Sequence, residues 1–464
     1  MRTQIDSRID RASLFGMIDR QRLATAHAAE EQRFIDAHPH SARMAQQARG
    51  SLLGGVPMAW MTRWPGSFPV FFEQAQGARF TDVDGIEYVD FCLGDTGAMT
   101  GHAVPEVAEA LHRQAQRGIT TMLPNADAAW VGEELTRRFG LPVWQMAMTA
   151  TDANRFVLRF ARHLTGRPKV MVFDWCYHGS VDETLVIAGP NGKTVSRSGS
   201  IGPQVDPALT SVVVPFNDLD AVEQALAVGD VACVLMEPAL TNIGIVLPDP
   251  GFLEGVRALT RQYGSLLVID ETHTICVGPG GATAAWRLEP DFFVIGKTIG
   301  GGMPAAAYGM TAAVAQQLMP TLTDSSIDVS GVGGTLTGNA LALAAVRATL
   351  SCSLRDVDFA HMIPLATEWA RGVQATIDEF GLPWHVQQLG ARAEYWFCPP
   401  PRNGADAAAA CDAELDAFMH LWAINRGILL TPFHNMALLS PYHTSDDVAL
   451  HTSVFREAVQ ALRS

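Results

Sequence analysis

Five short apolar runs, separated by stretches of helical character, constrain the fold of this chain more than any other feature. They are Val170–Phe173, Ser211–Val214, Val231–Met236, Ser265–Ile269 and Phe292–Ile295. Continuous apolar strands that alternate with helices are typical of a mostly parallel sheet covered on both faces. The sequence therefore predicts an α/β fold whose large domain is built around such a sheet.

The two ends of the chain have a different character from this central part. Residues 1–50 are rich in Ala, Arg, Gln and Glu and predict a helical N-terminal arm. Residues 78–90 predict two short strands around an Asp-Gly turn, and an Ala-rich helix is expected over 339–350. We therefore divide the chain into the arm, residues 51–98 as the N-terminal part of a small domain, 99–345 as the large domain, and 346–464 as the C-terminal part of the small α+β domain.

Charge and composition exclude some classes of partner. The net charge of -15 argues against a nucleic acid backbone as the main partner. No window approaches 18 uninterrupted apolar residues, so no membrane span is expected, and the charged N-terminus lacks the apolar core of a signal peptide. The seven cysteines are scattered without a CxxC pair, which favours reduced thiols and a cytoplasmic location.

Lys297 and Asp270 each come at the end of a predicted strand. A lysine near apolar walls loses stability as a cation and can become a nucleophilic amine. A carboxylate at the neighbouring strand end could keep a pyridine nitrogen protonated, which is what pyridoxal phosphate requires. Each residue also has an ordinary explanation, a surface lysine for Lys297 and a structural ion pair for Asp270. The spacing of the two favours the cofactor site.

Further residues could complete such a site. Tyr177-His178-Gly179 follows another strand, where an aromatic ring could stack on a planar cofactor or could simply pack in the core. The hydroxyl-rich segments 149–154 and 333–339 each precede a helix, where they suit a phosphate or ordinary helix capping equally well.

Other cofactor and metal motifs fail on spacing. The P-loop pattern around Lys297 needs a glycine where Asp291 stands, and that around Lys193 needs one where Ile187 stands. No HExxH motif is present, and the spacing of the histidines predicts no metal site. We therefore interpret His102, His163 and His273 as structural.

These motifs follow one another in an order that resembles class III (ω-type) aminotransferases of pyridoxal phosphate fold type I, the aspartate aminotransferase-like fold. The glutamate-1-semialdehyde 2,1-aminomutase-like branch is the most similar. The ordered motifs are Gly101-His102, residues 149–154, Tyr177-His178-Gly179, Glu237-Pro238, Asp270-Glu271, Gly296-Lys297 and residues 334–339. The resemblance covers about residues 54–464.

The resemblance implies a role for each matching residue. Lys297 would be the Schiff-base lysine, Asp270 the partner of the pyridine nitrogen, and Tyr177, with His178 beside it, the residue against the ring. Thr149, Ala150 and Thr151 would bind the phosphate, and Asn242 the 3-hydroxyl of the cofactor. Thr335 would reach the phosphate of the neighbouring subunit, which implies a homodimer with its active sites at the subunit interface.

The sequence departs from the family pattern at several positions. Ala150 replaces a glycine of the usual phosphate loop, and Thr272 replaces an apolar residue that lies against the ring. Residues 431–434 supply no arginine where some members bind a carboxylate. Trp60, Arg63 and Arg392 are the remaining candidates for contacts with the substrate.

We predict an aminotransferase that moves an amino group from an amine or a β- or ω-amino acid to a keto acid or aldehyde by ping-pong chemistry. The first alternative is an isomerase on the same scaffold, either a 2,1-aminomutase or an amino-acid racemase or epimerase. The second is a scaffold or regulator with impaired cofactor binding, which the altered phosphate loop leaves open.

Overall fold

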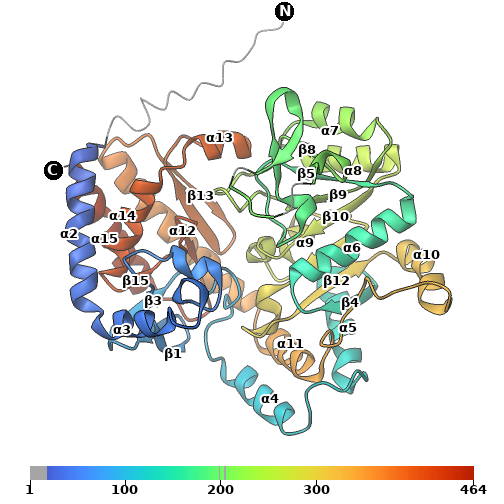
Figure 1. Cartoon of the computed structure of the whole chain (residues 1–464), viewed down its shortest axis with the longest axis horizontal. Helices are drawn as coiled ribbons and strands as arrows, with labels where there is room; N and C mark the ends of the chain where they lie inside the picture. Colours follow the sequence, from blue (N-terminus) through green and yellow to red (C-terminus); the bar gives the residue numbers. More distant parts are fainter. Residues whose placement is uncertain (1–17, 198, 203–204, 464) are drawn as a thin grey trace, which may run out of the picture.

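A seven-stranded sheet forms the centre of the larger part of the molecule (Figure 1). The computed structural model describes residues 18–197, 199–202 and 205–463. In spatial order the strands are β4 (Val143–Ala147), β12 (Ala306–Met310), β11 (Phe292–Ile295), β10 (Leu266–Asp270), β9 (Val231–Met236), β5 (Lys169–Phe173) and β8 (Ser211–Val214). Strand β12 is antiparallel to both neighbours, and the other pairs are parallel. The predicted α/β class and mostly parallel sheet are confirmed.

Helices pack around this sheet. They are α4 (Pro105–Ala115), α5 (Ala126–Phe139), α6 (Ala150–Thr165), α7 (Leu219–Leu226), α8 (Phe252–Tyr263), α9 (Gly281–Ala285), α10 (Ala312–Thr323) and α11 (Ala340–Cys352). Helix α6 begins after the N-cap Thr149 and ends at Gly166 in the left-handed conformation. Its apolar residues pack against β9, β11 and β12, so its N-terminus lies at the edge where the parallel strands end.

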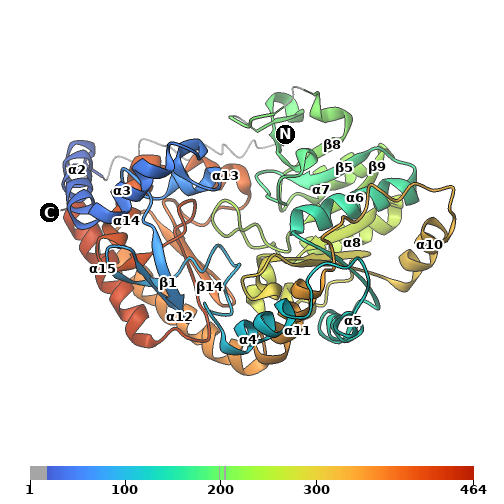
Figure 2. The same ribbon diagram turned by 60° about the horizontal axis from the view of Figure 1, so that its bottom comes forward.

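A smaller α+β unit combines both ends of the chain. Strands β1 (Phe72–Gln76), β2 (Arg79–Asp82) and β3 (Glu87–Asp90) are joined by β15 (Ile428–Leu429), which pairs parallel to β3. A second sheet contains β13 (His385–Leu389), β14 (Arg392–Trp396) and β16 (Met436–Leu438). Figure 2 shows the blue N-terminal elements and the red C-terminal helices on the same side of the molecule. The predicted small domain from both chain ends is therefore confirmed.

The helices of this unit are α2 (Arg20–Ala37), α3 (Pro39–Ala48), α12 (Asp356–Glu379), α13 (Gly404–Ala409), α14 (Ala413–Ile424) and α15 (Ser445–Arg463). Helix α2 packs on α14 and α15, and Glu30 forms an ion pair with Arg426. Residues 20–37 and 39–48 thus form helices, and α2 packs on the body of its own chain. The first 17 residues of the predicted arm lie outside the described residues.

The remaining elements are short. A hairpin pairs β6 (Val186–Ala188) with β7 (Thr194–Ser196). Single 3-10 turns cover Leu53–Gly55, Ala59–Arg63, Asp182–Thr184, Pro190–Gly192, Pro207–Leu209, Thr274–Val277 and Lys297–Gly300. Of the helices in the described ranges, none is both long and apolar enough to span a membrane.

Candidate active site

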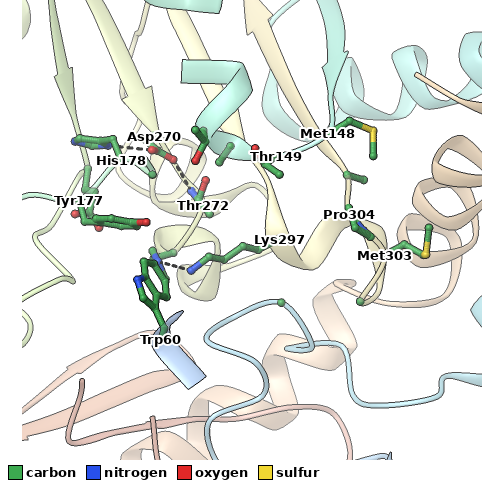
Figure 3. A pocket seen from close by; sticks show the side chains of 18 residues that line it. Trp60, Met148, Thr149, Tyr177, His178, Asp270, Thr272, Lys297, Met303 and Pro304 are labelled. Carbon is green, nitrogen blue, oxygen red and sulfur yellow. Dashed lines mark hydrogen bonds and ion pairs between the residues drawn. The ribbon is translucent and has the colours of Figure 1, made fainter. Parts of the chain in front are cut away.

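A cavity of about 320 Å³ opens where the parallel strands of the large sheet end (Figure 3). The segments that follow β5, β10 and β11 supply its walls, together with the start of α6 and the turn at Ala59–Arg63. Eight residues predicted from the sequence line it: Trp60, Thr149, Ala150, Thr151, Tyr177, His178, Asp270 and Lys297. Residues separated by more than 200 positions therefore meet at one place, as the strand-end argument predicts.

Asp270 is held as a buried carboxylate at the end of β10. Its Oδ2 accepts hydrogen bonds from Asn154 Nδ2 and His178 Nδ1, each at 2.9 Å, and its Oδ1 accepts one from the Thr272 amide at 3.1 Å. Burial favours the neutral acid, but the bond and charge of His178 outweigh it and lower the pKa of Asp270. The site therefore presents an anion that could pair with a protonated ring nitrogen.

The start of helix α6 provides a place for a phosphate. Thr149 caps the helix by accepting a bond from the Asp152 amide, and the first turn faces the cavity through Ala150 and Thr151. The dipole and free amides of a helix N-terminus favour an anion. Gly179, at φ +83°, lies so close to Thr151 that an added Cβ would be 2.9 Å from both its Cα and its Cβ. Only glycine fits at this position.

Lys297 lies in surroundings that the sequence did not predict. It stands at φ +52°, and its Nζ is 2.7 Å from Asp95 Oδ2 and 2.8 Å from His273 Nε2. The expected apolar walls are thus replaced by a carboxylate and an imidazole. The interpretation of His273 as a structural residue is wrong, because His273 lines the cavity and contacts the lysine amine.

The loop that carries Asp95 has an unusual backbone. The backbone is in the left-handed region at Leu93 (φ +46°), Asp95 (φ +51°) and Thr96 (φ +80°). Residues other than glycine rarely adopt this conformation. Asp90 fixes the start of the loop by accepting bonds from the amides of Cys92 and Leu93, each at 2.8 Å. Backbone strain of this kind concentrates at functional sites. The only sequence signal for it is the pair of glycines that flank Asp95-Thr96.

Aromatic side chains form the wall of the cavity beside Lys297. The Trp60 ring centroid lies 5.7 Å from that of Tyr177 and 5.7 Å from that of Phe433, and both pairs are edge-to-face. Met148 and Met303 add apolar surface on another side (Figure 3). Among the described residues that line the cavity, none is an arginine.

Four predicted site residues do not line the cavity. Asn242 donates to the Trp175 carbonyl oxygen at 3.0 Å. Arg63 is exposed on its turn, and Thr335 is exposed in the loop before α11. Arg392 is buried on β14, where it donates to Glu394 Oε2 at 2.8 Å and to the Thr241 carbonyl oxygen at 2.9 Å. Its charge is therefore already neutralised within the chain.

Glu237 also lines the cavity and was not predicted as a site residue. Its Oε2 accepts a bond from Thr241 Oγ1, whereas its buried Oε1 has no hydrogen-bond partner within the described part of the chain. Burial raises the pKa of Glu237 to about 7. A buried oxygen without a partner, an ionised Asp270, an amine and an open helix N-terminus together fit a ring cofactor that carries a phosphate and an aldehyde.

Comparison with known proteins gives one consistent family. Residues 60–362 match the model of the family described as aminotransferase class-III. A glutamate-1-semialdehyde 2,1-aminomutase from Desulfitobacterium hafniense (strain Y51) is 34% identical over 424 residues, which are 90% of this chain and 97% of that protein.

Solved structures agree with the family model. A glutamate-1-semialdehyde aminomutase from Pseudomonas aeruginosa PAO1, solved as a lysine-to-alanine variant in complex with PMP, is 50% identical. The match has a TM-score of 0.94 and covers 96% of this chain and 100% of that one. An omega-transaminase from Sphaerobacter thermophilus is 29% identical, with a TM-score of 0.82 and coverage of 92% and 98%.

The family match spans the whole of the large sheet and the cavity at its edge, including Trp60, the start of α6, Asp270 and Lys297. The relatives extend the similarity into both parts of the smaller unit. The predicted fold type and the predicted cofactor are confirmed with the family. This chain belongs to the class-III aminotransferases, which use pyridoxal phosphate.

Proposed function

We propose that the chain is a pyridoxal phosphate-dependent aminomutase, which moves an amino group between adjacent carbons of a single substrate. The observation that carries the proposal is its similarity over nearly its whole length to proteins named glutamate-1-semialdehyde 2,1-aminomutase. The first prediction from the sequence, a ping-pong aminotransferase, becomes the second candidate, because these relatives favour the isomerase, which is the first alternative in the sequence analysis.

The residues of the cavity divide the work between binding and proton transfer. When bound, pyridoxal phosphate supplies an electron sink for the carbon that loses a proton. Lys297 would hold the cofactor through Nζ and then move that proton. Asp270, kept ionised by His178, would hold the proton on the ring nitrogen. The amides and hydroxyls at the start of α6 would bind the phosphate, and Tyr177 would lie against the ring.

The substrate pocket favours an apolar or aromatic group over a carboxylate. Trp60 and Tyr177 form one wall, with Phe433 packed against Trp60, and neither Arg63 nor Arg392 lines the cavity. A substrate carboxylate would therefore find no arginine among the described lining residues. Because this aromatic wall suits apolar or aromatic amines as donors, an aminotransferase is the second candidate function.

A homodimer is part of the proposal. Thr335 lies in an exposed loop that borders a surface hollow, together with residues 120–124. Within a single chain Thr335 does not line the cavity that contains Lys297. We propose that it serves the phosphate site of a second copy, as the family resemblance implies.

The test is a comparison of single-substrate and two-substrate turnover. The purified, cofactor-loaded protein is mixed with glutamate-1-semialdehyde alone, and with apolar amines in the presence or absence of a keto acid. Conversion of the aldehyde to its isomer without a keto acid supports the aminomutase. Turnover of amines that strictly needs a keto acid would replace it by the aminotransferase. A protein that shows no visible absorbance band after addition of pyridoxal phosphate would contradict both.

A further inference from the structure

The side-chain nitrogen of Lys297 is held by groups from two distant segments of the chain. Asp95 comes from the strained loop after β3, and His273 comes from the turn after β10. Thr96 Oγ1 lies 2.9 Å from the other nitrogen of His273, so a chain of hydrogen bonds runs from Thr96 through His273 to Lys297 and Asp95. Neither the two partners of Lys297 nor Thr96 behind His273 has a role in the proposed function so far.

The chemistry of each partner determines the direction of the bonds. A carboxylate only accepts, so Lys297 donates to Asp95. An ammonium only donates, so His273 accepts at Nε2, carries its own proton on Nδ1 and donates that proton to Thr96. Burial, followed by the charge of Lys297, lowers the pKa of His273 well below its usual value, which agrees with a neutral ring.

Asp95 is not needed to build its own loop. The loop is fixed by the Asp90 carboxylate and by backbone bonds from Asp95 to Cys92 and from Ala98 to Leu93. The Asp95 side chain bonds Lys297 through Oδ2, and its Oδ1 is buried without a hydrogen-bond partner in the described chain. Removing its charge should therefore act on the lysine and leave the loop intact.

We infer that Asp95 and His273 are positioning residues that hold the amine of Lys297 at the cavity before it bonds to the cofactor. Asp95 stabilises the ammonium form, and His273, oriented by Thr96, fixes the direction of the nitrogen. This inference rests on the proposed role of Lys297. It adds that the readiness of the amine to react is set by a loop that precedes it by about 200 residues.

Capture of the cofactor by the cofactor-free protein reports directly on this amine. The neutral Nζ forms a bond to the aldehyde carbon, and the aldehyde oxygen leaves as water with the two amine protons. Only the neutral amine reacts, so the capture rate rises with pH. The charged and titratable groups around Lys297 are Asp95, His273, His434, Arg392, Glu394, Tyr177, Asp270, His178 and Glu237.

The experiment follows the rise of the visible band of the lysine-bound cofactor across a range of pH. In Asp95→Asn the capture rate near neutral pH should rise by about tenfold or more, because the opposite charge that holds the amine as an ammonium has been removed. Asp249→Asn is the matched control, since it makes the same change in a surface ion pair with Arg402 and should leave the profile unchanged. An Asp95→Asn profile that coincides with that of the control would overturn the inference.

His273 provides an independent test that does not depend on the folding of the Asp95 variant. His273→Ala should lower the capture rate at the high-pH plateau by about tenfold or more, because the amine is no longer directed. His273→Gln, whose side-chain oxygen can accept a hydrogen bond, should restore most of the rate. A substitution that only disturbs packing would not be rescued in this way, and equal plateaus in all three proteins would contradict the role of His273.

Two further results distinguish a failure of the positioning role from a failure of the proposed function. Lys297→Ala should form no lysine-bound band, and a normal band in that variant would overturn the proposed function itself. If instead Asp95→Asn raises KM for an amine substrate and leaves cofactor capture unchanged, Asp95 contacts the substrate. This outcome would contradict the positioning role of Asp95 and would be compatible with the proposed function.

Discussion

Replacing Gly179 with alanine tests the phosphate site most directly. Gly179 has φ +83°, which costs an L-residue about 1–2 kcal/mol. The added Cβ would also lie 2.9 Å from Thr151 Cα and Cβ, and forcing an extra carbon into a packed contact costs about 1–3 kcal/mol. The sum, about 2–5 kcal/mol, is below the stability of most native proteins, so the variant should fold.

The steric part of this cost should appear as weaker cofactor binding. Thr151 lies in the first turn of α6, so the collision is relieved by moving the end of the helix that is proposed to bind the phosphate. If about 1–3 kcal/mol of binding energy is lost, the Kd for pyridoxal phosphate rises by about 5- to 150-fold. Equilibrium titration of the cofactor-free protein, followed by absorbance, measures this change.

Gly229→Ala is a closely matched control. Gly229 has the same φ of +83°, but nothing lies within 4 Å of its added Cβ. It should therefore lose only the backbone part of the stability, about 1–2 kcal/mol, and bind the cofactor normally. If both variants bind pyridoxal phosphate like the original protein, the start of α6 is not the phosphate site, and the reasoning from close contact fails.

Three further predictions follow from the same geometry. Burial raises the pKa of Glu237 from 4.5 to about 7, so its contribution to stability is present at low pH and is lost as pH rises through this window. In urea unfolding at several pH values, the free energy of unfolding of the original protein should fall relative to that of Glu237→Gln by up to about 1.4 kcal/mol per pH unit. The same pH dependence in both proteins would contradict the raised pKa of Glu237. Trp60→Ala removes two ring contacts worth about 0.5–1.5 kcal/mol each, so KM should rise more for aromatic than for small aliphatic amines, with Phe433→Ala giving a smaller effect in the same direction. Thr335→Ala should weaken cofactor binding without changing the unfolding curve, whereas the exposed Thr323→Ala should change neither, and equal affinities in the two variants would refute the role of Thr335 in a dimer.

The sheet could be predicted from the sequence only where apolar runs are continuous. All five predicted strands are present because β-branched and aromatic residues buried on both faces leave a clear pattern. Strand β12 was missed because its sequence, Ala306–Met310, is rich in Ala and Gly, which have low strand propensity. Pairing with β11 and β4 makes it a strand, and that tertiary effect has no local signature.

The pairing of Arg392 has a signal in the sequence. Arg392 and Glu394 are two residues apart in an apolar stretch, and residues at this spacing on a strand point to the same face. An arginine and a glutamate that share a buried face are expected to pair, and Arg392 Nη2 indeed lies 2.8 Å from Glu394 Oε2. The contact between Asp95 and Lys297 offered no such pattern, because it depends on a strained loop 202 positions away.

Ala150, the main departure from the family's phosphate loop, can be explained from the packing around it. Its φ is not positive, so the backbone there does not require glycine. A Cβ on Gly296 would lie 3.0 Å from the Ala150 methyl carbon and 3.1 Å from its amide nitrogen. The methyl group at residue 150 therefore fits because residue 296 has no side chain, and the start of α6 keeps its place at the cavity. The altered loop therefore gives no physical reason for impaired cofactor binding. Gly296→Ala, by contrast, should weaken the binding of pyridoxal phosphate, because its Cβ would press on the start of α6.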